Sequence, residues 1–190
     1  MKTQINEQVI IRLAKPEDKY AIIEIQYKAL KVLSAKDYNP KQLKALLKSK
    51  SIARKSPETI FIAEINQRTV GFASLLQPPN TIGAVFVHPK FARKNIGTKL
   101  LQHLEQEAIK NEVPILWVCS SLTGHGFYRA NGYQSIRKTT FPLYSTYIPC
   151  IQMKKRLLPV SKDEIVKEFS QFLTMTLISI AIIFLSSLKN

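Results

Sequence analysis

The 190-residue chain has few cysteines, histidines and acidic residues, and each shortage excludes a class of protein. Two cysteines, Cys119 and Cys150, are too few for the disulfide framework of a small secreted domain, and each lies in an apolar, strand-like run. We therefore expect two buried thiols in a reducing compartment. The three histidines have neither ligand spacing nor cysteine neighbours, so we expect no metal site. Residues 1–20 are polar and mixed, and we expect no secretory signal.

The shortage of acidic residues makes the chain strongly basic. Lys and Arg number 28 against 13 Asp and Glu, for a formal net charge of +15. Such a surface favours an anionic partner: a phosphorylated cofactor, an acidic lipid surface or nucleic acid. No aromatic-basic strand signature is present, so we expect no specific nucleic-acid partner. With 45% hydrophobic residues, the composition predicts a packed core and excludes a disordered chain.

Hydrophobic periodicity predicts an α/β domain over about residues 8–156, within a domain spanning 1–158. Helical spacing of apolar residues follows Pro16 and recurs after Pro40 and Asn95, and an Asn-Gly pair at 131–132 ends a short helix. Strands and a hairpin fill the intervals. The expected strands are 9–13, 59–65, 69–75, 82–87, 114–119, 133–137 and 147–153, and the expected helices follow residue 16 and span 40–47, 95–110 and part of 122–131. The run 82–87 is apolar throughout, which predicts a strand buried on both faces, and 114–119 is predicted to be a further buried strand.

Residues 85–101 contain the most informative motif. A buried strand ends at Pro89, a basic loop follows, and a helix begins with a small residue in its first turn. The first amides of a helix have no internal partners, and the helix dipole favours an anion there. Gly97 has no side chain to block a phosphate, and Arg93 and Lys94 add positive charge. Taken alone, this segment either binds a pyrophosphate at residues 94–98 or merely begins a helix.

This segment resembles the cofactor-binding motif of the GNAT superfamily of acyl-CoA N-acetyltransferases, in which a strand leads to a Gln/Arg-x-x-Gly-x-Gly/Ala loop and a helix. The loop here reads Ala92-Arg93-Lys94-Asn95-Ile96-Gly97, with Ala92 in place of Gln or Arg and Asn95 in place of the first glycine. Asn tolerates a left-handed backbone, so we expect the turn to keep its shape. The resemblance continues through 115–133, including the segment Phe127-Tyr128-Arg129-Ala130-Asn131-Gly132-Tyr133, and covers about residues 9–154.

The resemblance implies a mixed, mostly antiparallel central sheet flanked by helices. It also implies transfer of an acetyl group from acetyl-CoA to a primary amine by direct attack, with Tyr128 protonating the CoA thiolate. Because no enzyme nucleophile is needed, Cys119 has no catalytic role in this scheme. The cofactor-binding residues that it implies are Val85, Phe86, Val87, Ala92, Arg93, Lys94, Asn95, Ile96, Gly97, Thr98 and Ser121.

The general base and the acceptor stay open at this point. Relatives often use a glutamate on the fourth or fifth strand, but residues 82–88 and 115–121 contain no acid. His88 is the nearest titratable group, and proton loss through water is equally consistent with the sequence. Residues 31–55 hold eight basic residues and one acid, which indicates either a solvated helix face with a loop or a basic rim that steers an anionic ligand. The alternative function is a non-catalytic module that keeps the fold and binds CoA or a partner.

The C-terminal segment has a different composition. Residues 159–168 read as a linker, and no charged residue occurs from Ser170 to Leu188. We interpret residues 169–188 as a hydrophobic helix that anchors the domain in a membrane, since about 20 apolar residues span the hydrocarbon. The basic residues before it would keep the enzyme domain on the cytoplasmic side. The alternative is a helix that packs on the domain or mediates a dimer.

Overall fold

The computed structural model describes residues 8–49, 57–77 and 80–160, and beyond these Lys162, Val166 and Ser170, which are helical. The chain divides into two compact units, Met1–Leu157 and Leu158–Asn190. In the described part of the chain, no helix has the length and apolar character needed to cross a membrane. Apart from Ser170, the helix predicted over 169–188 lies outside the described residues.

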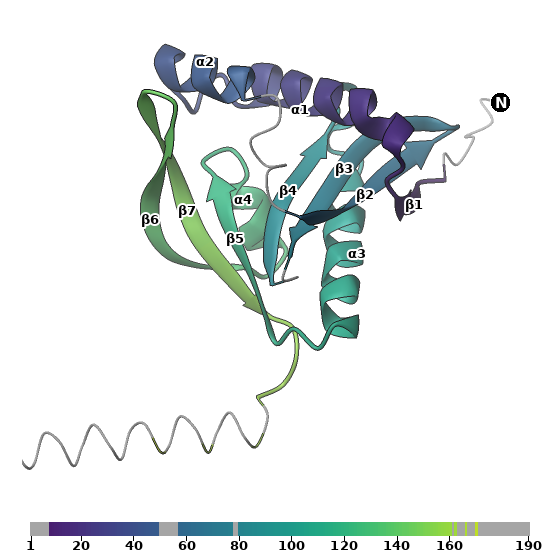
Figure 1. Cartoon of the computed structure of the whole chain (residues 1–190), viewed down its shortest axis with the longest axis vertical. Coiled ribbons are helices and arrows are strands. Elements are labelled where there is room, and N and C mark those ends of the chain that lie inside the picture. The colour runs from purple at the N-terminus through teal and green to yellow at the C-terminus, as the bar shows by residue number, and fades with distance from the viewer. Residues whose placement is uncertain are drawn as a thin grey trace, which may run out of the picture. The chain divides into compact units, whose positions relative to one another are not determined.

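Seven strands form one sheet in the order β1-β2-β3-β4-β5-β7-β6 (Figure 1). Every neighbouring pair is antiparallel except β4 and β5, which are parallel. The mixed, mostly antiparallel sheet predicted from the sequence is therefore confirmed. The strands are β1 (Ile10–Leu13), β2 (Glu58–Ile65), β3 (Arg68–Leu76), β4 (Thr81–Val87), β5 (Ile115–Ser121), β6 (Gln134–Leu143) and β7 (Thr146–Arg156).

Helices cover both faces of the sheet (Figure 1). They are α1 (Lys19–Leu33), α2 (Pro40–Lys48), α3 (Ile96–Lys110) and α4 (His125–Ala130), with short 3-10 turns η1 (Pro16–Asp18) and η3 (Pro89–Phe91). Ile22 and Ile25 of α1 pack in one apolar cluster with Phe72 and Ala84, whereas α3 contributes Leu104 to the larger cluster on the opposite face. Side chains of β4 alternate between these clusters, so this strand presents one set of residues to α1 and the other to α3.

A charged network holds the start of α1 against the sheet. Arg12 donates from its two terminal nitrogens to both carboxylate oxygens of Asp18, at 2.8 and 3.0 Å, and to Glu64 at 2.7 Å. The backbone N–H of Lys15 adds a 2.7 Å bond to Asp18. The Arg12 hydrogen bonds hold the pKa of Asp18 below its ordinary value, so this buried carboxyl is ionised at neutral pH.

The loop after α1 is tied to the far half of the sheet. The hydroxyl of Tyr38 accepts from the N–H of Leu122 at 3.0 Å, and the carboxylate of Asp37 accepts from the Thr123 hydroxyl at 2.7 Å. These two bonds hold the loop after α1 against the residues that follow β5. A reciprocal capping box between Asn39 and Gln42 then begins α2.

Three expectations from the sequence need correction. The apolar run of β4 is only half buried, because β4 pairs with β5 at Thr81–Trp117 and Ile82–Val118 and a cavity opens beyond. Cys119, predicted to be buried, is exposed, whereas Cys150 is buried. The last two strands also extend beyond their predicted bounds: β6 is largely exposed and polar, so hydrophobic alternation marked only part of it.

Candidate functional site

The cavity forms where β4 and β5 diverge. Both strands keep their other neighbours: β4 pairs with β3 as far as Val87, and β5 pairs with β7 as far as Ser121. The gap between them therefore leaves an edge of each strand without a sheet partner. An extended chain lying in this gap could hydrogen-bond to the free main-chain groups of β4.

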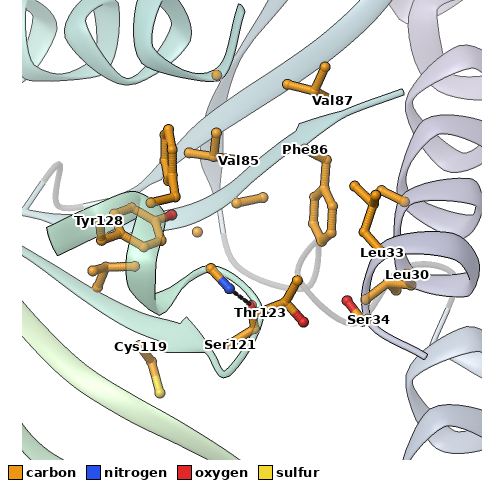
Figure 2. A pocket seen from close by; sticks show the side chains of 17 residues that line it. Leu30, Leu33, Ser34, Val85, Phe86, Val87, Cys119, Ser121, Thr123 and Tyr128 are labelled. Atoms are coloured by element: carbon orange, nitrogen blue, oxygen red, sulfur yellow. Dashed lines mark hydrogen bonds between the residues drawn. The ribbon is translucent and has the colours of Figure 1, made fainter. Parts of the chain in front are cut away.

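The cavity has a volume of about 270 Å³ and a predominantly apolar wall. Figure 2 shows Leu30, Leu33 and Ser34 on the α1 side, with Tyr128 on the opposite side. Phe86 lies between these two groups. The wall is made by Ala29, Leu30, Leu33, Ser34, Gly83, Ala84, Val85, Phe86, Val87, Gly97, Val118, Cys119, Ser121, Thr123, Gly124, Phe127 and Tyr128.

Tyr128, the predicted catalytic residue, lies in this wall. Its side chain is only 6% exposed, and its ring packs edge-on against the rings of Phe127 and Tyr133 at centroid distances of 5.1 and 5.4 Å. The hydroxyl points into the cavity towards Val85 (Figure 2). Burial raises the pKa of Tyr128 well above its usual range, so the phenol stays protonated at neutral pH and can donate a proton or a hydrogen bond.

The turn before α3 has the backbone that the sequence suggested. Arg93 and Asn95 both have positive φ, 64° and 60°. Asn95 makes no side-chain cap to the helix, and the first turn of α3 contains no acidic residue. Arg93, Lys94 and Asn95 are exposed. The helix start is thus uncapped by Asn95 and surrounded by positive charge, which suits an anionic ligand.

Other residues of the predicted cofactor site have distinct surroundings. Ile96 is 1% exposed and belongs to the core, so only its main chain could reach a ligand. Ala92 and Thr98 are half-buried on either side of the turn. The hydroxyl of Ser121 accepts a 3.0 Å hydrogen bond from the N–H of Gly124, shaping the turn into α4 while lining the cavity.

Gly97 has a packing role that the sequence did not reveal. A Cβ at this position would lie 3.3 Å from a ring carbon of Phe127 and 3.7 Å from a methyl of Val87. The glycine therefore lets the start of α3 approach α4 closely. A large side chain at position 97 would displace the ring next to Tyr128, in addition to any effect on a phosphate.

His88, considered as a base from the sequence, has a structural position. It is buried at the end of β4, and its Nδ1 accepts from the N–H of Lys90 at 3.2 Å. Desolvation, followed by nearby positive charges, lowers the pKa of His88, which keeps the ring neutral. It is not part of the cavity wall. Its neutral ring caps η3 and has no access to a ligand in the cavity.

Neither cysteine directs its thiol into the cavity. Cys119 lies in the cavity wall, but its sulfur points away from the other lining side chains (Figure 2). Burial, with a smaller effect of Cys119, raises the pKa of the Cys150 thiol to about 12. Within the part of the chain that the structure describes, no cluster of His, Cys, Asp and Glu could hold a metal ion.

Sequence reasoning missed the α1 side of the cavity. Leu30 belongs to the helical spacing of apolar residues that follows Pro16, and Thr123 lies in the segment 115–133 that resembles the family, but Leu33 and Ser34 carried no signal of their own. The Asp37–Thr123 bond brings Ser34 and Thr123 to the same wall. Only the loop connection after α1, which depends on tertiary contacts, places these residues together.

Comparisons with known proteins agree with this geometry. The family described as "Acetyltransferase (GNAT) domain" matches residues 23–157. The fold is similar to that of a GCN5-related N-acetyltransferase from Rhodopseudomonas palustris, with 29% identity, a TM-score of 0.72 and coverage of 77% of this chain and 94% of that one.

Two further solved structures are similar at lower identity. One is the PaiA N-acetyltransferase of Thermoplasma acidophilum in complex with coenzyme A (20% identity, TM-score 0.63, coverage of 78% of this chain and 99% of that chain). The other is the ribosomal-protein-S18-alanine N-acetyltransferase of Escherichia coli (18% identity, TM-score 0.61, coverage of 82% and 97%). No curated protein matches the chain. With most of its length matched by the family, the chain belongs to the GNAT family of acetyltransferases.

Proposed function

We propose that this protein transfers the acetyl group of acetyl-CoA to a primary amine by direct attack, with Tyr128 protonating the departing thiolate. The observation that carries the proposal is the cavity between the diverging strands β4 and β5, which has the Tyr128 hydroxyl in its wall. Gly97, in the first turn of α3, lines the same cavity. The fold is similar to that of the PaiA N-acetyltransferase, which was solved in complex with coenzyme A, and this supports a CoA ligand here.

The residues present fit acetyl-CoA as a co-substrate. The exposed cations Arg93, Lys94 and Lys99 surround the start of α3, where a pyrophosphate would meet unpaired amides. The free edge of β4, from Val85 to Val87, suits the amide-bearing pantetheine arm. The thioester would then lie in the mainly apolar cavity, between Phe86 and Tyr128.

The reaction needs three events. The nitrogen lone pair of a neutral amine attacks the thioester carbonyl carbon and forms the C–N bond. The C–S bond then breaks, and the sulfur takes the Tyr128 proton, which solvent later replaces. The attacking nitrogen loses one proton, so an amide and a free thiol are the products. An N–H group on β4 near the carbonyl oxygen would stabilise its developing charge.

Calorimetric titration of the full chain with acetyl-CoA tests the proposal. We expect micromolar binding that the charge reversal Arg93→Glu/Lys99→Glu weakens by at least about tenfold, because both side chains are exposed and their loss leaves the core intact. Gly97→Glu is a poor control, since it would also displace Phe127. Release of free thiol with an amine panel then measures turnover.

The two candidate functions give different results in this experiment. Binding together with amine-dependent thiol release supports the acetyltransferase. Binding without turnover on any amine would support the alternative, a non-catalytic CoA-binding module. A folded chain that binds no acetyl-CoA would overturn both.

A further inference from the structure

The loop after α1 places a carboxylate behind one residue of the cavity wall. Asp37 accepts the hydroxyl hydrogen of Thr123 at 2.7 Å, and Thr123 lines the cavity. Asp37 is half-buried, and among the residues that the structure describes Thr123 is the side-chain partner of its carboxylate. Asp37 does not line the cavity itself, so it can act on a ligand there through the Thr123 hydroxyl.

Neighbouring contacts hold the Thr123 hydroxyl in one orientation. The hydroxyl of Tyr38 accepts from the N–H of Leu122 at 3.0 Å, so two consecutive residues of the α1 loop bind two consecutive residues after β5. The N–H of Asp37 also donates to the carbonyl oxygen of Ser34 at 3.0 Å. The hydrogen of the Thr123 hydroxyl is therefore committed to Asp37, and the oxygen lone pairs are left to accept from a ligand.

A second hydroxyl completes this polar part of the wall. Ser34 follows the last residue of α1, is 5% exposed and lines the cavity. Figure 2 shows the Ser34 oxygen directed towards Thr123. The C-terminal end of a helix carries a partial negative charge, and the Asp37 carboxylate adds a full one behind Thr123. A ligand group between these hydroxyls therefore meets an environment that favours a cationic hydrogen-bond donor over a carboxylate or a phosphate.

The α1 side of the cavity next to these hydroxyls is apolar. Ala29, Leu30 and Leu33 line it, and Figure 2 shows Leu30 and Leu33 on the same side of the cavity as Ser34. Leu33 is 37% exposed, so this part of the wall reaches the protein surface. An amine whose nitrogen lies at Thr123 can therefore bury an apolar body against these side chains.

We propose that the Thr123 hydroxyl binds the nitrogen of the acceptor amine, that Asp37 positions this hydroxyl, and that the α1 side of the cavity selects a primary amine with an apolar body. The proposal rests on the acetyl transfer proposed above. The ammonium donates a hydrogen bond to the Thr123 oxygen and loses one proton to solvent. Its lone pair then attacks the thioester carbonyl carbon. A second proton leaves the nitrogen for solvent, the C–S bond breaks, and the sulfur takes the Tyr128 proton.

Steady-state release of thiol with n-pentylamine tests the role of Thr123. Thr123→Val replaces the hydroxyl by a methyl group, and we expect kcat/KM for the amine to fall by about 10- to 100-fold, mainly through a higher KM. Thr123→Ser keeps the hydroxyl and should stay within about threefold of the wild type. Glu24→Gln, at an exposed position of α1, should leave the rate unchanged. An unchanged KM in Thr123→Val would overturn the assignment of Thr123.

A double-mutant cycle tests whether Asp37 acts through Thr123. Asp37→Ala should lower kcat/KM by about fivefold or more, whereas in a Thr123→Val background the same substitution should change it by less than about twofold. Equal effects in both backgrounds would overturn positioning by Asp37. A bond that only held the two loops together would instead lower Tm and the affinity for acetyl-CoA. We expect calorimetry to give a Kd for acetyl-CoA within about twofold of wild type in every variant, since none alters the turn before α3.

A matched pair of amines tests the substrate class. n-Pentylamine and 3-methoxypropylamine have the same length, but an ether oxygen replaces one methylene and would be desolvated against Leu30 and Leu33. At equal concentrations of neutral amine we expect a kcat/KM about tenfold higher for pentylamine. Leu33→Asn should narrow the ratio, because its amide can donate to the ether oxygen.

Two outcomes would separate this proposal from the one beneath it. A wild type that binds acetyl-CoA but acetylates the ether amine as well as pentylamine, or acetylates neither, would overturn the apolar acceptor subsite. A wild type that binds no acetyl-CoA would overturn the proposed function and this subsite with it.

Discussion

Replacing Arg12 by methionine tests how the domain holds α1, the helix that forms one wall of the cavity. Methionine keeps much of the arginine stem but removes the charge and every donor. The substitution breaks the hydrogen bonds of 2.8 and 3.0 Å to Asp18 and that of 2.7 Å to Glu64. The side chain of Asp18 is only 7% exposed, so its carboxylate would stay buried with the backbone N–H of Lys15 as its remaining partner.

The expected cost follows from these contacts. Removing one member of a buried ion pair typically destabilises by about 3–5 kcal/mol. The side chains of Arg12 and Glu64 are 28% and 20% exposed, so water can replace part of what is lost. We therefore expect a loss of about 2–4 kcal/mol at pH 7, which for a domain of this size lowers Tm by roughly 5–12 °C.

The pH dependence has a defined sign. The folded state lowers the pKa of Asp18, so its contribution is present above the ordinary aspartate pKa of about 3.9 and disappears as the pH falls through the lower folded value. The difference in unfolding free energy between wild type and Arg12→Met should be complete at pH 6–7. It should shrink below about pH 4, because the carboxyl of the variant then becomes neutral.

Urea denaturation from pH 7 to pH 3 measures this difference, with two controls. Lys28→Met breaks an exposed ion pair with Glu24 on the same helix and should change stability by less than about 0.5 kcal/mol. Arg12→Met/Asp18→Asn removes the unpaired charge and should be no less stable than Arg12→Met alone. A loss below 1 kcal/mol at pH 7, or one independent of pH, would refute the reasoning.

Three further predictions concern the site and its support. Tyr128→Phe should lower kcat by about 100-fold or more while the Kd for acetyl-CoA changes less than about threefold, as single-turnover kinetics and calorimetry would show; an unchanged kcat would remove Tyr128 from the mechanism. Gly97→Ala should destabilise the domain by about 1–2 kcal/mol because its methyl meets Phe127, and Phe127→Leu in the same chain should relieve part of that loss in thermal melts. Leu104→Ala, at a position with 0% exposure, should cost about 2–5 kcal/mol in urea denaturation, and a smaller loss would mean that the core under α3 collapses to fill the space.

Local sequence was sufficient to predict the elements that depend on short-range patterns. The stripe of Leu100, Leu101, Leu104 and Ala108 predicted α3, and all four residues are buried in the structure. The left-handed turn at Asn95 followed from the tolerance of asparagine for positive φ. The mixed sheet came from the family resemblance, which spans elements whose order along the chain is informative. The membrane anchor over 169–188 stays a prediction from composition.

The sequence predicted strand bounds and burial wrongly where a strand is partly exposed to solvent. Residues 137–140 of β6 are mostly exposed and polar, so they showed no hydrophobic alternation and the strand was predicted too short. Cys119 lies in a run that reads as fully buried, yet its thiol is exposed although the strand is paired with β7. Both errors arose because the exposure of a strand depends on its neighbours in the sheet.

The sequence by itself determined the helices, most strands, the left-handed turn before α3 and the presence of Tyr128 in an aromatic segment. Tertiary structure alone decided what faces that tyrosine. The cavity opens beside it because the pairing of β4 with β5 ends at Ile82 and Val118, and Leu33 reaches the cavity because α1 packs against Phe72 and Ala84. Hydrophobic periodicity indicates on which face of its own helix or strand a residue lies. The distance between two elements depends on strand register and packing, which no local pattern contains.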